Sequence, residues 1–265
     1  MNKKLTTSNN FKERIIHAKE NAVTRMTMAL LRPFNRHKMI NLDHVRLDPQ
    51  NPIVLLGNHA EIYGPIASAL CLPISVRFWV ISRMMFNKQD VRKYLYDNTF
   101  SKKTYLPVFV RKALAWYLGW LSVNVMNSLH AIPVYRDSPM KLRQTIRESL
   151  DALADGDNLM IFPEHPEGKY VKGGISELSP GFIMLAEAWW KKSGKKLRMM
   201  PVYANREERT FTFGEEIVYE PEKGFAAEQE RILREAYQQL LALSGADLSE
   251  DAESGGEKDE GTPRD

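Results

Sequence analysis

Short apolar runs alternate with amphipathic segments along most of the chain. Each short run predicts a buried strand, and they lie at residues 52–57, 76–81, 131–135, 158–162 and 197–203. The segments between and after them have helical periodicity, and they lie at residues 66–72, 140–154, 182–192 and 228–243. Strands that alternate with helices predict an α/β fold with a mixed, mostly parallel sheet flanked by helices.

The two ends of the chain differ from this central pattern. Apolar side chains recur at steps of three and four residues from Phe11 to Pro33, which predicts an N-terminal amphipathic helix within residues 1–45. This helix either packs on the core or lies on anionic lipid, and the pattern is compatible with both. Residues 46–244 then form the α/β domain, in which 210–213 and 216–219 predict a final hairpin around Gly214.

Charge is distributed unevenly along the 265 residues, whose formal net charge is +4. Residues 245–265 carry eight acidic and two basic side chains and have no apolar periodicity, so we expect a disordered acidic tail. The remaining body is therefore strongly basic, which is typical of proteins that meet nucleic acid or an anionic bilayer. No apolar stretch reaches the roughly 18 residues of a membrane span, since Pro107, Arg111 and Lys112 interrupt the longest candidate. We therefore expect a peripheral protein on the cytoplasmic face of a membrane.

Three polar clusters directly follow predicted strands, which is where α/β sheets bind their ligands. They are Asn58-His59-Ala60-Glu61, Tyr135-Arg136-Asp137 and the segment 162–169, which contains Glu164, His165, Glu167, Gly168 and Lys169. Together they supply a candidate base, several carboxylates and two cations. These groups can remove a proton from a hydroxyl and hold an anionic substrate.

In order along the chain, these clusters resemble the motifs of the glycerol-phosphate and lysophospholipid acyltransferase family. Asn58-His59 after an apolar strand is similar to the first motif, and Ile132-Pro-Val-Tyr-Arg136 is similar to the second, which ends in Arg. Phe162-Pro-Glu164 with Pro166-Glu-Gly-Lys169 resembles the third motif, and Met200-Pro-Val-Tyr203 resembles the fourth. The resemblance spans roughly residues 50–220.

The chain departs from the family pattern at two places. The first motif of the family has an Asp five residues after the His, where this chain has Gly64. The resemblance implies that another carboxylate orients His59, and Glu61 is the nearest in sequence, with Tyr63 close enough to assist. The third motif is stretched, so that either Glu164 or Glu167 corresponds to the Glu of the family. Gly64 itself is expected to leave room where the Asp would have stood.

The resemblance implies acyl transfer from acyl-CoA or acyl-carrier protein to a hydroxyl of a glycerol-phosphate, lysophospholipid or related lipid acceptor. His59 would act as general base, Glu61 would stabilise the imidazolium, and Asn58 would lie in the substrate site. Arg136 and Lys169 would hold a phosphate of the acceptor, beside Glu164, Glu167 and Gly168. An apolar groove from Leu106 to Met126 would take the acyl chain.

Other classes of function remain open to different degrees. A catalytically impaired pseudoenzyme or lipid-binding adaptor on the same fold is the main alternative, because Gly64 replaces the acid. An esterase is disfavoured because no Gly-x-Ser-x-Gly segment is present, and no nucleic-acid motif accompanies the basic body. Histidine spacing and the single Cys71 predict no metal site, and no phosphate-binding glycine loop predicts a cofactor.

Overall fold

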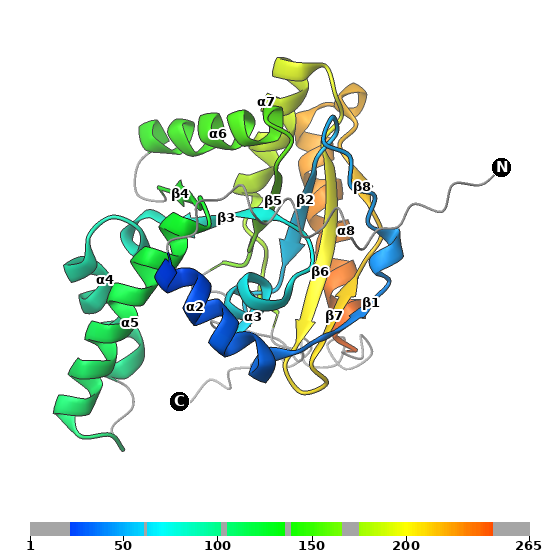
Figure 1. Cartoon of the computed structure of the whole chain (residues 1–265). Helices are drawn as coiled ribbons and strands as arrows, with labels where there is room; N and C mark the ends of the chain where they lie inside the picture. Colours follow the sequence, from blue (N-terminus) through cyan, green and yellow to red (C-terminus); the bar gives the residue numbers. More distant parts are fainter. Residues whose placement is uncertain (1–21, 61–62, 102–104, 136–138, 166–174, 246–265) are drawn as a thin grey trace, which may run out of the picture.

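A central sheet with helices on both faces forms the body of the molecule (Figure 1). The computed structural model describes residues 22–60, 63–101, 105–135, 139–165 and 175–245. The predicted α/β class with a mixed, mostly parallel sheet is confirmed.

Among the described residues the sheet has eight strands, and five of them run parallel to one another. The strands are β1 (Lys38–Ile40), β2 (Ile53–Gly57), β3 (Val76–Ile81), β4 (Ile132–Val134), β5 (Asn158–Ile161), β6 (Arg198–Asn205), β7 (Thr210–Phe213) and β8 (Ile217–Val218). Their order is β1-β7-β6-β2-β5-β3-β4, with β8 also paired to β6. The block β6-β2-β5-β3-β4 is parallel, whereas β7 and β8 are antiparallel to β6. The carboxyl ends of β2, β3, β4, β5 and β6 therefore meet at one edge of the sheet.

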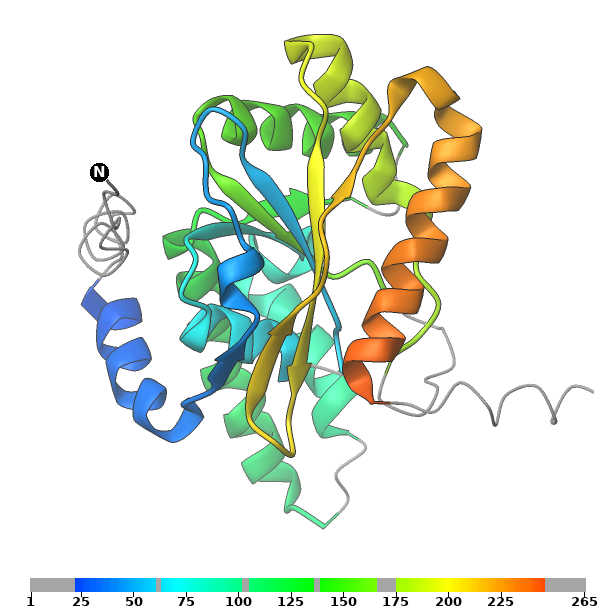
Figure 2. The same cartoon turned by 90° about the vertical axis from the view of Figure 1, so that its right-hand side faces the viewer.

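Helices cover the sheet in two layers. They are α2 (Ala22–Leu31), α3 (Tyr63–Cys71), α4 (Lys88–Leu95), α5 (Val108–Ser128), α6 (Pro139–Ala154), α7 (Ile183–Ser193) and α8 (Phe225–Ser244). Short turns are η1 (Arg32–Asn35), η2 (Leu42–His44), η3 (Ser82–Met84), the π-turn η4 (Tyr96–Phe100), η5 (Pro180–Phe182) and η6 (Pro221–Lys223). Figure 2 shows α8 on one side of the sheet and α2 on the other, while α4 and α5 project from the body as a pair in Figure 1.

Alternate side chains of the central strands separate the apolar interior into two main clusters. On β2, Val54 and Leu56 pack with residues of α6, α7 and α8, whereas Ile53 and Leu55 pack toward α3 and the end of α5. All four are fully buried, with at most 1% of their surface exposed. A strand that is buried on both faces needs apolar side chains at successive positions. Residues 52–57 therefore show no alternation of polar and apolar side chains.

The structure corrects the predicted arrangement of the last strands. Residues 210–213 and 217–218 are strands, but they do not form a hairpin with each other. β7 pairs with the end of β6 and β8 pairs with its beginning, so both follow β6 one after the other. The hairpin prediction was wrong because an eight-residue β6 offers enough edge for both short strands.

The terminal predictions are tested only in part. The predicted N-terminal helix is present from Ala22 to Leu31, while its first half and the acidic tail lie outside the described residues. The segment 105–126 contributes α5, which runs on to Ser128 and packs against α4. Within the described ranges, no helix is both long and apolar enough to cross a bilayer.

Candidate functional site

A buried carboxylate joins the ends of the two central strands. β2 and β5 are parallel neighbours, and His59 and Glu164 each follow the carboxyl end of one of them. The backbone N–H of His59 donates a hydrogen bond to Oε1 of Glu164 at 2.9 Å. Two residues that are 105 positions apart in sequence are thus held together at the edge where α/β sheets bind ligands.

The chain that carries Glu164 is itself fixed by an antiparallel segment. Glu164 forms an isolated β-bridge with Leu178. On either side of it, the N–H of His165 donates to the carbonyl of Glu177 and the N–H of Ser179 donates to the carbonyl of Pro163, both at 2.7 Å. These bonds pair the Glu164 backbone with residues 177–179, and from this paired segment its side chain reaches the end of β2.

Asn58 anchors the other side of this junction. Its side chain is 1% exposed and bonds the backbone of Ala204 twice, accepting from the N–H at 2.7 Å and donating to the carbonyl at 3.2 Å. β6 extends beyond the end of β2, so this amide replaces the strand pairing that β2 no longer supplies. Asn58 therefore serves to position the turn that carries His59.

Burial alters the acidity of Glu164. The residue is 4% exposed, and its Oε2 atom has no hydrogen-bond partner among the described residues. Desolvation raises the pKa of this carboxyl from 4.5 to about 7, although the hydrogen bond from His59 acts in the opposite direction. Burial, with a contribution from the Glu164 charge, also raises the pKa of the neighbouring Tyr203 phenol. A carboxyl group that titrates near neutrality beside a histidine is typical of a functional site.

The His59 ring lies against an aromatic wall. Its ring centroid is 5.8 Å from that of Phe162, at an interplanar angle of 80°. Phe162 stacks in turn on Phe78, with centroids 6.4 Å apart. Edge-to-face packing of this kind restricts the orientation of the imidazole.

A residue in the left-handed conformation directly follows His59. Ala60 has a φ of 41°, in the left-handed region that costs a non-glycine residue about 1–2 kcal/mol. The N–H of Tyr63 donates to the carbonyl of Ala60 at 3.1 Å, and the N–H of Gly64 donates to the carbonyl of His59 at 3.2 Å. These bonds turn the chain directly into α3.

Gly64 leaves no space for a side chain, contrary to our expectation. A Cβ atom at this position would lie 1.9 Å from the carbonyl oxygen of Asn58. The first turn of α3 packs directly on the end of β2, so the space that an Asp would need is filled by backbone. In this backbone, position 64 cannot supply the acid that orients His59.

Tyr63 contacts residues that the sequence did not indicate as its partners. Its hydroxyl forms a short hydrogen bond with Nε2 of His37 and lies 3.4 Å from the carbonyl oxygen of Asn205. The guanidinium of Arg206 lies over its ring, 5.9 Å from the centroid, and burial raises the pKa of the phenol. Tyr63 therefore ties α3 to the segment before β1 and to the end of β6.

Several predicted site residues lie outside the described ranges. They are Glu61, Arg136, Glu167, Gly168 and Lys169. Tyr135 immediately precedes Arg136 and follows β4, whose carboxyl end is at the same edge of the sheet. Of the candidates that the structure describes, it brings together Asn58, His59 and Glu164.

Sequence reasoning missed the partners that hold these groups in place. The His37 side chain bonds Tyr63 from 26 residues away, across separate elements of the fold. Ala204 bonds Asn58 through its backbone, which any residue at position 204 would offer. The packing of Phe162 against His59 could have been expected from the sequence, because Phe162 lies two residues before Glu164 in the same polar cluster.

Neither models of known protein families nor curated proteins match this sequence. Within the described part of the chain, no three His, Cys, Asp or Glu side chains come together as a metal site would require.

Proposed function

We propose that this protein is an O-acyltransferase that moves a fatty acyl group from a thioester donor to a hydroxyl of a lipid acceptor. The observation that carries the proposal is the buried contact between Glu164 and the backbone of His59 at the carboxyl edge of the sheet. It joins a candidate base and a carboxyl group from two separate sequence clusters. Apart from Gly64 and the stretched third motif, the residue types and their order along the chain resemble those of the acyltransferase motifs.

In the proposed reaction His59 accepts the proton of the acceptor hydroxyl while that oxygen attacks the thioester carbonyl. The new C–O bond gives a tetrahedral intermediate. Its collapse breaks the C–S bond, and the protonated His59 returns the proton to the leaving thiolate. No covalent enzyme intermediate is needed, in agreement with the absence of a nucleophile elbow from the sequence.

Glu164 would act as a positioning residue in this scheme. Its hydrogen bond is to the His59 backbone. Glu164 therefore fixes the position of the His59 backbone, from which the side chain extends, and does not select the tautomer of the imidazole. Because its pKa is raised to about 7, the carboxyl group can be neutral or charged near neutral pH. A charged Glu164 would favour the imidazolium that forms when His59 takes the proton. Glu61, Arg136, Glu167 and Lys169 remain proposed partners of His59 and of the acceptor phosphate.

We also propose that the protein works at an anionic membrane surface. On α2, Met26 and Leu30 are each 69% exposed, and on α5, Phe109 and Trp116 are 74% and 56% exposed. The two helices contact each other. Basic residues of α4 and α5, including Lys93 and Lys112, accompany them. Apolar and aromatic side chains interleaved with cations are typical of interfacial binding.

A lipid-binding adaptor without activity is the second candidate. The observation that favours it is the packing of Gly64 against Asn58, which excludes an orienting acid at that position. Such a protein would bind lysophospholipid or acyl thioester and release it unchanged.

Purified protein separates the two candidates. It is incubated with acyl-CoA or acyl-carrier protein and a panel of glycerol 3-phosphate and lysophospholipids, and the products are identified by mass spectrometry. Acyl transfer to one acceptor class supports the enzyme. Saturable binding of vesicles and lysophospholipid with no acylated product from any pair contradicts it and supports the adaptor.

A further inference from the structure

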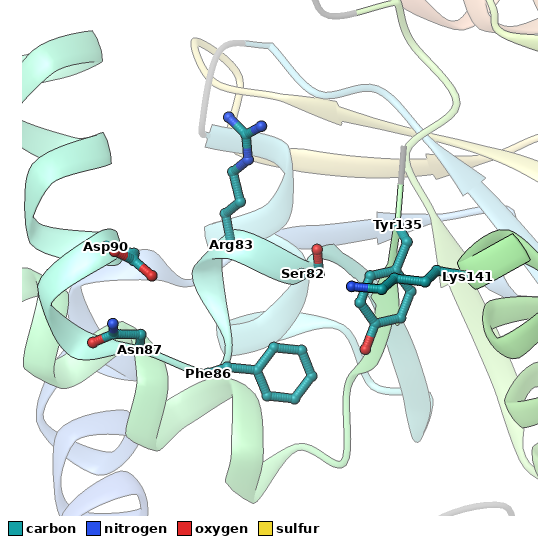
Figure 3. A pocket seen from close by; sticks show the side chains of 7 residues that line it. All are labelled: Ser82, Arg83, Phe86, Asn87, Asp90, Tyr135 and Lys141. Carbon is teal, nitrogen blue, oxygen red and sulfur yellow. The ribbon is translucent and has the colours of Figure 1, made fainter. Parts of the chain in front are cut away.

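A hollow lies at the same edge of the sheet, beyond the ends of β3 and β4. It is an open hollow with a volume of about 420 Å³, and it is bordered by η3, the start of α4, the residue after β4 and the start of α6 (Figure 3). This volume is within the range of roughly 300–1,000 Å³ that is usual for small-molecule sites. β3 lies next to β5 in the sheet, so the hollow and Glu164 follow the carboxyl ends of neighbouring strands.

Two aromatic rings form one wall of the hollow. The rings of Phe86 and Tyr135 have centroids 6.4 Å apart and an interplanar angle of 14°, so they are nearly parallel. Phe86 is 63% exposed, so its ring is accessible to a ligand in the hollow. Figure 3 shows both rings bordering the same space. A planar heteroaromatic ligand would extend this stack and cover the exposed ring of Phe86.

Two cations border the same space. The Nζ atom of Lys141 lies 5.6 Å from the centroid of the Tyr135 ring, and Arg83 lines the hollow from η3. Lysine and arginine beside an aromatic stack are suited to a phosphate ester of an aromatic base. On the opposite wall, Asp90 and Asn87 offer a carboxylate and an amide to hydroxyl or amino groups (Figure 3). The lining therefore has a net positive charge and contacts for a base, a sugar and a phosphate.

We propose that this hollow binds a phosphorylated adenine nucleoside, and specifically the adenosine 3′,5′-bisphosphate part of coenzyme A. The identification with coenzyme A rests on the proposed acyl transfer, while nucleotide binding itself rests on the hollow alone. A glycerol phosphate headgroup would satisfy the cations but would leave the Phe86–Tyr135 stack uncovered. The site would thus favour CoA thioesters over acyl-carrier protein, whose prosthetic group lacks the nucleotide.

Calorimetric titration of the full chain with adenosine 3′,5′-bisphosphate tests the site without any acyl transfer. We expect saturable binding to the wild type, weakened about tenfold or more by Phe86→Ala through lost stacking, and weakened also by Lys141→Ala. Met140→Ala is the matched control, because Met140 is 81% exposed and adjacent to Lys141 but does not line the hollow. Thermal melting of each variant confirms that it is folded.

Three results of the titration would overturn the inference. They are no binding of the nucleotide, equal binding of glycerol 3-phosphate, and a loss of binding in Met140→Ala as large as that in Phe86→Ala. Equal binding of glycerol 3-phosphate would assign the hollow to the phosphate of the acceptor.

A kinetic comparison separates failure of the nucleotide site from failure of the proposed function. Acyl-CoA is compared with acyl-pantetheine, which has the same thioester but no nucleotide. Phe86→Ala should raise KM about tenfold for acyl-CoA only and leave kcat unchanged. Equal KM values for the two donors in the wild type would overturn the coenzyme A site and leave acyl transfer standing. Nucleotide binding without turnover of any thioester would overturn acyl transfer and the assignment to coenzyme A, while the nucleotide site would stand.

Discussion

Replacement of Glu164 by Gln removes a buried ionisable group and keeps its shape. The amide oxygen can still accept the hydrogen bond from the His59 N–H, so the junction between β2 and β5 is expected to survive. What changes is the pH dependence of stability. Oε2 is buried without a hydrogen-bond partner in the described ranges, so a charge on this carboxyl is poorly solvated.

The direction and size of the effect follow from the raised pKa. In the unfolded chain the carboxyl titrates near 4.5, whereas in the folded protein it titrates at about 7. Between these pH values the folded protein binds a proton that the unfolded chain has lost. The contribution of this group to the free energy of unfolding is therefore highest below pH 4.5. It falls as the pH rises to about 7 and is constant at higher pH. The total fall corresponds to about 3 kcal/mol.

Urea denaturation of the wild type and Glu164→Gln from pH 4.5 to 8.5 measures this difference, because the other titrating groups are common to both proteins. The free energy of unfolding of Glu164→Gln minus that of the wild type should increase by about 3 kcal/mol as the pH rises from 4.5 to about 7, and it should be constant above that pH. The same substitution at Glu177, which is exposed and pairs with the Glu164 segment, serves as the control. A difference that does not change with pH, or one that changes in the opposite direction, would refute the reasoning.

Three further predictions concern the turn after β2 and the exposed helices. Gly64→Ala should lower the free energy of unfolding, measured by urea titration, by about 1–3 kcal/mol, because its Cβ would meet the Asn58 carbonyl. Gly181→Ala is the control and should be neutral or slightly stabilising in the same titration, because its Cβ would meet only Ser179 at 4.0 Å. Asn58→Ala should lower the free energy of unfolding by about 2 kcal/mol or more, because it leaves two buried backbone groups of Ala204 without the Asn58 side chain as partner. An unchanged melting temperature in calorimetry would contradict this role of Asn58. The protein should sediment with anionic vesicles more than with neutral ones, and Trp116→Ala should weaken this binding; equal binding to both vesicle types would argue against an anionic surface.

The fold class followed from the sequence because the sheet is built mainly from buried parallel strands. A strand such as β2 needs apolar side chains on both faces, which leaves a run that is visible without any structure. The prediction of Val76–Ile81 as a strand is confirmed to the residue. β1 was missed because Lys38–Ile40 is only three residues long and lies at the edge of the sheet, where a short strand leaves little pattern.

The candidate site was predicted in its parts but not in its connections. Sequence placed His59 and Glu164 after strands, but it could not determine that these two strands are neighbours. It also left the role of Glu164 open, because the bond runs to a backbone N–H that any residue at position 59 would offer. The space at Gly64 was misjudged for a related reason. A glycine can mark either an open surface or a close backbone approach, and only the contact with Asn58 distinguishes the two.

The turnover of His59→Ala tests the central proposal most directly. Purified wild type, His59→Ala and His44→Ala are assayed with the donor and acceptor pair that gives the most product. His44 is the control, because it contacts Glu215 at 3.2 Å and lies outside the site. We expect His59→Ala to lose about 10²–10⁴ in rate with little change in melting temperature, and His44→Ala to keep its activity. Wild-type turnover in His59→Ala would show that His59 is not the base and would contradict the proposed mechanism.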